Sequence, residues 1–153
     1  MPKFNFKLQP LLKVKSQLED NLKNVLGKAI QKLEMEKAAL RSLESKKDRY
    51  INEFNEKSRK TTVDKLIKFN NYISFLIVKI NRQKENVNCA CQNVDKIREE
   101  LIKIVKERKI LDKLKERNYE IFRQEQLKEE SKIVDGIISF KQKRERGIGE
   151  TDA

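Results

Sequence analysis

The sequence predicts an all-α protein, an antiparallel two-helix coiled-coil hairpin in which the second helix is longer than the first. Residues 28–135 contain neither glycine nor proline, so the tight turns that sheets and barrels require are almost absent. Charged residues make up 39% of the chain and hydrophobic residues 37%, whereas a compact domain is more apolar and less charged. The apolar residues recur every seven positions, in two registers that do not join.

The first helix is predicted over residues 8–56, from a heptad pattern with two exceptions, Glu36 and Lys47. An apolar stripe beginning at Leu8 extends this pattern towards the N-terminus. The two rows are Leu26, Leu33, Leu40 and Phe54, and Leu22, Ala29, Leu43 and Tyr50. This spacing is typical of one face of a coiled-coil helix.

The break between the two registers predicts a turn at residues 57–61. Thr61 followed three residues later by Asp64 resembles a capping box at the start of the next helix. Folding back at this turn would place position i opposite about position 119 − i, as in an antiparallel helical hairpin. Leu11 would then face Arg108.

The second helix is predicted over residues 62–140, where the heptad is strongest and only Gln83 interrupts it. The rows are Leu66, Ile73, Ile80, Val87, Val94 and Leu101, and Phe69, Leu76, Ala90, Ile97, Ile104 and Leu111. More than five heptads are a coiled-coil signature. Residues 1–141 are therefore expected to form a single hairpin domain. The polar tail 142–153, which contains Gly147 and Gly149, is expected to be disordered.

The composition argues against an enzyme. Without any histidine, imidazole-based catalysis and histidine-ligated zinc are excluded, and we expect no catalytic, cofactor-binding or metal-binding residues. Cys89 and Cys91 point to different sides of a helix, so we expect two unpaired thiols in a reducing compartment. No apolar run approaches the length of a membrane span. These features predict a cytoplasmic protein without membrane insertion.

The net charge of +12 is concentrated in two segments that the hairpin would bring together at its open end. The residues that we expect to bind a partner there are Lys13, Lys15, Arg108, Lys109, Lys113, Lys115 and Arg117. Such a basic surface suits an acidic protein, nucleic acid or a membrane surface. The alternative is that these lysines are simply solvated.

Aromatic residues gather near the turn instead. Phe54 and Phe69 are assigned to the seam between the helices, with Tyr50. Tyr72 and Phe75 lie off it, so we expect them to be exposed and to be candidate binding anchors. Partial cover by neighbouring side chains is the alternative.

Four segments, taken together, resemble the FliJ family, small coiled-coil proteins of the bacterial flagellar export apparatus. They are Phe4-x-Phe6-x-Leu8-x-x-Leu11-Leu12, the aromatic stretch Phe69–Leu76, the basic run Glu107–Arg117, and Gln126–Phe140. The resemblance implies a non-enzymatic stalk that couples the hexameric export ATPase, through the basic open end, to the cytoplasmic domain of the export gate protein. It also implies contact with export chaperones and a cytoplasmic location, peripherally associated with the inner-membrane export apparatus at the flagellar base.

The same resemblance assigns gate-facing residues near the turn, namely Leu43, Tyr50, Tyr72 and Leu76. Two alternatives to the export stalk stay open. One is a basic coiled coil that binds nucleic acid, although the sequence holds no module that reads DNA or RNA and nucleic acid is not the expected partner. The other is a structural homodimer in which long helices of two chains pair.

Overall fold

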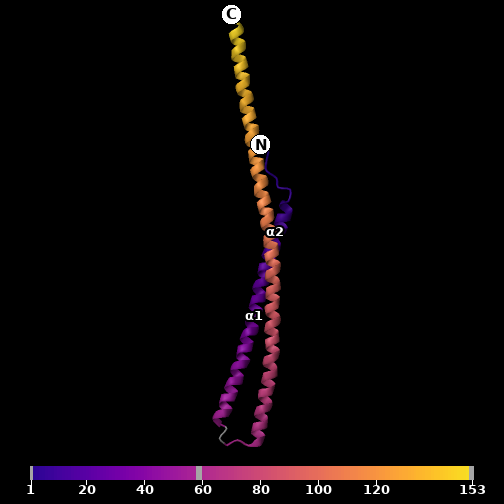
Figure 1. The fold of residues 1–153 in the computed structure, drawn as a ribbon, viewed down its shortest axis with the longest axis vertical. Helices are drawn as coiled ribbons and strands as arrows, with labels where there is room; N and C mark the ends of the chain where they lie inside the picture. The colour runs from indigo at the N-terminus through magenta and orange to yellow at the C-terminus, as the bar shows by residue number, and fades with distance from the viewer. Residues whose placement is uncertain (1, 58–59, 152–153) are drawn as a thin grey trace. The chain divides into compact units, whose positions relative to one another are not determined.

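The computed structural model describes residues 2–57 and 60–151, and these form two α-helices (Figure 1). Helix α1 spans Gln9–Lys57 and helix α2 spans Val63–Thr151. The described residues form no strand. The predicted fold class is confirmed: the chain is an all-α hairpin whose second helix is the longer one.

The helix boundaries differ most at the C-terminal end. The sequence predicted helices over 8–56 and 62–140, and a disordered tail over 142–153. In the structure α2 instead continues to Thr151, because residues 141–146 all have side chains that favour helix and Gly147 costs only about 1 kcal/mol relative to Ala. The predicted turn at 57–61 falls partly on residues 58 and 59, which, like residues 152 and 153, lie outside the described residues.

Local hydrogen bonds explain where both helices begin. Before α1, the Gln9 amide donates to the Phe6 carbonyl over 3.1 Å, and Pro10 occupies the first turn, where its missing N–H is not needed. Before α2, the Lys65 amide donates to Thr62 Oγ1 over 3.4 Å. Thr62 is therefore the N-cap, one residue later than the Thr61-based capping box that the sequence suggested.

The contacts divide the chain into two compact units. The hairpin unit is Gln17–Val105, and the terminal unit joins Met1–Ser16 with Lys106–Ala153. Because α1 and α2 both pass through the two units, each unit contains a part of both helices.

The seam of the hairpin unit is a narrow apolar core. Leu76 and Val94 are 1% and 2% exposed. The central cluster contains small residues on both helices; its buried members are Ala29, Leu33, Ala90, Val94 and Ile97. Alanine at facing positions lets two helix backbones approach closely, so this part of the seam is tightly packed.

Two of the three heptad exceptions, Glu36 and Gln83, are partners across the seam. Gln83 Nε2 donates to the Glu36 carbonyl over 2.9 Å and also to Glu36 Oε2. The predicted register places these two residues opposite each other, as it does Tyr50 and Phe69, whose rings stack. A polar pair within an apolar seam is satisfied in one register and broken in shifted ones, which makes it a registry device.

This pair supports a stability prediction. Gln83→Leu alone should lower the free energy of unfolding by about 1 kcal/mol, because the half-buried Glu36 loses the hydrogen bonds that the Gln83 amide donates to it. Replacing both residues by Leu should recover that loss, since an apolar pair needs no hydrogen bond. Urea unfolding of the two variants, with the exposed Glu34→Leu as control, measures this. A double variant no more stable than Gln83→Leu would contradict the pairing.

Within the hairpin unit, the helices diverge towards the turn (Figure 1). Alanine residues lie at the middle of the seam, whereas Tyr50, Phe54 and Phe69 lie near the turn. Large rings occupy more space between two backbones than methyl groups do. The aromatic side chains therefore hold the ends of the helices apart.

Candidate partner-binding surfaces

The N-terminal segment docks against α2 within the terminal unit. Phe6 is 5% exposed and forms a buried cluster with Leu12 and Leu111. Phe4 contacts Tyr119 edge-to-face, with ring centroids 5.3 Å apart, and its ring centroid also lies 5.6 Å from that of Phe122. These contacts hold the N-terminal segment against α2.

Two of the seven predicted basic residues are paired inside the terminal unit. Lys15 Nζ lies 2.7 Å from Glu107 Oε2, and Arg108 Nη1 lies 2.6 Å from Asp112 Oδ2. All four side chains are at least partly covered, so these pairs are less screened by solvent than fully exposed ones. Lys15 and Arg108 are thus committed to internal partners.

The other five predicted residues form what we call the basic surface: Lys13, Lys109, Lys113, Lys115 and Arg117. Among the described residues, none of the five makes an ion pair within 4.0 Å. Lys109, Lys113 and Arg117 are exposed and follow one another at intervals of four, which places them on one face of α2. The terminal unit therefore presents a row of unpaired positive charges.

Aromatic rings near the turn pack on one another in the hairpin unit. The centroids of Phe54 and Phe69 are 3.8 Å apart with the rings 13° from parallel, and Tyr50 stacks on Phe69 at 5.4 Å. The prediction that Phe75 is exposed is confirmed, at 52%. Tyr72 differs from its prediction and is half-buried, because its ring lies 4.4 Å from that of Tyr50.

The four residues assigned to the gate by resemblance have unequal access to solvent. Leu43, Tyr50 and Tyr72 are half-buried, so part of each side chain can meet a partner. Leu76 is 1% exposed, so it would contribute to such a surface through packing in the seam and not through contact with the partner.

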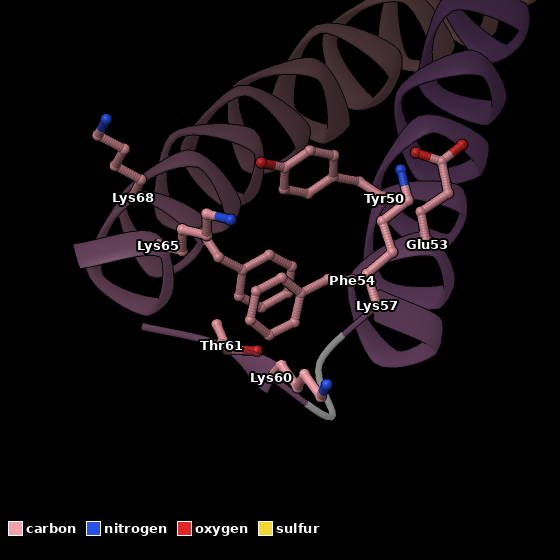
Figure 2. A pocket seen from close by; sticks show the side chains of 9 residues that line it. Tyr50, Glu53, Phe54, Lys57, Lys60, Thr61, Lys65 and Lys68 are labelled. Atoms are coloured by element: carbon pink, nitrogen blue, oxygen red, sulfur yellow. The ribbon is translucent and has the colours of Figure 1, made fainter. Parts of the chain in front are cut away.

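The hairpin unit also has a cavity that the sequence analysis missed (Figure 2). This turn-end cavity has a volume of about 360 Å³. Aromatic side chains from both helices form part of its wall, and four lysines surround it. The lining residues are Tyr50, Glu53, Phe54, Lys57, Lys60, Thr61, Lys65, Lys68 and Phe69. The signal in the sequence that could have indicated this cavity was the concentration of lysines on both sides of the predicted turn.

The sequence profile described as Flagellar FliJ protein matches residues 4–147, nearly the whole chain. The chain belongs to the FliJ family. Membership places it among the components of the flagellar export apparatus. The FliJ family is a non-enzymatic component of that apparatus. The resemblance that the four sequence segments indicated is thereby confirmed.

Comparison with solved structures supports the fold of this FliJ-family chain. A putative YscO homolog from Chlamydia trachomatis aligns with a TM-score of 0.54 and 24% sequence identity. The alignment covers 99% of the FliJ-family chain and 100% of the other. No curated protein sequence gives a significant match.

Three further features of the FliJ-family chain concern metal ligands, membrane spans and cysteines. Within residues 2–57 and 60–151, no group of three or more metal-ligating side chains comes together. No helix formed by the same residues has the length and apolar character needed to span a bilayer. Cys89 and Cys91 are free and exposed.

Proposed function

We propose that the chain is the stalk of the flagellar export apparatus, coupling the hexameric export ATPase to the membrane export gate and assisting the cycling of export chaperones. The family match over residues 4–147 carries this proposal. In it the protein catalyses no reaction and acts at the cytoplasmic side of the inner membrane, at the flagellar base. Its role is to transmit the state of one partner to the other.

The basic surface is the proposed contact with the ATPase ring. None of its five residues forms an ion pair with another residue that the structure describes, so an acidic partner would not have to break such pairs to bind them. Unpaired charges of one sign also raise the rate of association with a surface of opposite sign. Lys15 and Arg108, by contrast, would support this surface from within.

The turn-end aromatics are the proposed contact with the cytoplasmic domain of the gate. Tyr50 and Tyr72 combine apolar rings with hydroxyl groups, and such residues are common anchors in protein interfaces. Leu43 is half-buried on the same unit. Leu76 would act through packing, because its side chain is not accessible.

The coupling itself would be mechanical and allosteric. Helix α2 is one continuous helix that contributes to both units, so both proposed contacts involve the same element. If binding of one partner changes the affinity for the other by some factor, binding of the second partner changes the affinity for the first by the same factor. This reciprocity requires no chemical step in the stalk.

A reconstitution experiment tests the proposal. The purified chain should bind a hexameric export ATPase at one copy per ring and stimulate its ATP hydrolysis, and it should bind the isolated cytoplasmic domain of the gate. Absence of both interactions would overturn the proposal. Tight, strongly salt-dependent binding to nonspecific DNA would favour the nucleic-acid alternative, and sedimentation as a dimer of elongated chains would favour the structural homodimer.

A further inference from the structure

The turn-end cavity lies where the seam is less completely buried than it is at Leu76 and Val94. Leu76 and Val94 are almost completely buried, whereas Tyr50, Phe54 and Phe69 at the cavity wall are only half-buried. Large aromatic side chains bury more area than any others when they are fully covered. Their partial exposure leaves apolar surface that a side chain of another molecule can cover.

The charges around this cavity are unbalanced. Its lining holds four lysines, Lys57, Lys60, Lys65 and Lys68, against one acid, Glu53. In the described part of the chain none of these lysines is ion-paired within 4.0 Å. Figure 2 shows the lysines coming from α1, from α2 and from the segment between them. The four lysines therefore give the cavity and its rim a net positive charge.

We propose that the turn-end cavity binds an acidic peptide segment of a partner protein. An apolar side chain of the segment would pack against the aromatic wall, and carboxylates on either side of it would pair with the lysines. The inference rests on the proposed function in that the partner is expected at the turn end, and it adds the chemistry of the segment recognised. Such a site combines an apolar anchor with a charged rim, as interface hot spots do.

The ring geometry favours a peptide over single-stranded nucleic acid. Phe69 is stacked with Phe54, at 3.8 Å between ring centroids, and with Tyr50, at 5.4 Å, and each of these rings is 13° from parallel to it. Because these rings stack on one another, fewer ring faces are free to stack on bases. Ring edges carry partial positive charge, which suits carboxylates.

Fluorescence anisotropy with two labelled peptides tests the inference on the full-length chain. The acidic probe is Asp-Glu-Phe-Asp-Glu and the neutral probe is Asn-Gln-Phe-Asn-Gln, which keeps the aromatic residue. The acidic probe should bind at least about tenfold more tightly, with an affinity that falls as salt increases. Equal affinities, or tighter binding of a labelled oligothymidylate, would overturn the inference.

Charge-reversal variants locate the binding. The affinity for the acidic probe should fall by at least about tenfold in a triple variant with Lys57→Glu, Lys65→Glu and Lys68→Glu. The matched control reverses three exposed lysines elsewhere in the hairpin unit, Lys28, Lys46 and Lys96, and should bind nearly as the unmodified chain does. Similar affinities of the two triple variants would overturn the inference. Circular dichroism verifies that both remain helical.

Binding measurements with the isolated gate domain distinguish a failure of this inference from a failure of the proposed function. If the gate domain binds, but the acidic peptide does not bind and the cavity variants do not weaken binding, the inference fails while the stalk function stands. If the peptide binds in the cavity but the gate domain and the ATPase do not bind, the proposed function fails while the acidic-peptide site stands.

Discussion

Reversing three charges of the basic surface should abolish stimulation of the export ATPase. Lys109→Glu, Lys113→Glu and Arg117→Glu together change a row of exposed positive charges into negative ones. An acidic contact on the ring would then face like charges, which costs several kcal/mol across an interface. We expect stimulated hydrolysis to fall to the basal rate of the ATPase, as measured by phosphate release.

A matched control distinguishes local from general electrostatics. Lys84→Glu, Lys96→Glu and Arg98→Glu make the same change of net charge in the hairpin unit, where all three side chains are exposed. This variant should still stimulate the ATPase. Unchanged stimulation by the first variant would rule out the basic surface as the ring contact, and equal losses in both would show only an effect of net charge.

Truncating Leu76 should cause the largest loss of stability. Leu76→Ala is expected to lower the free energy of unfolding by about 2–5 kcal/mol, because it removes buried methyl groups and leaves a cavity in a narrow seam. Urea unfolding followed by circular dichroism measures this loss. Binding to the gate domain should weaken as a consequence, since a loosened seam no longer holds Tyr72 against Tyr50.

A volume-conserving change separates packing from contact at this position. Leu76→Met should cost less than about 1.5 kcal/mol and should leave binding to the gate domain nearly unchanged. A stably folded Leu76→Met variant that no longer bound the gate domain would show that Leu76 touches the partner directly. It would also require the seam to open on binding, because Leu76 is buried in the free chain.

Hairpin, helix order and register follow from the heptad pattern. A long run of apolar residues at intervals of seven determines which face of each helix is buried, and one break in the pattern indicates where the chain turns. Two of the three exceptions to the pattern also fit the predicted register, because Glu36 and Gln83 face each other. The pattern could not show that they bond, since a polar residue at a seam position is equally compatible with a solvated side chain.

Features that depend on space rather than on periodicity were not predictable. The docking of Phe4 and Phe6 was missed because residues before Pro10 follow no helical period, although alternate phenylalanines between two prolines are typical of an extended apolar segment. The turn-end cavity depends on how far aromatic rings separate two helices, which spacing along the sequence does not encode. The pairing of Lys15 with Glu107 likewise required side-chain positions.

The docking of the N-terminal segment has a consequence for biosynthesis. Phe4 and Phe6 are translated before Leu111 and Tyr119, which cover them and lie more than 100 residues further along the chain. Contacts between such distant positions form late in folding, after the pairs nearest the turn. On the ribosome these two phenylalanines therefore stay in water until translation has passed Tyr119, and a nascent chain stalled before that point would carry them uncovered.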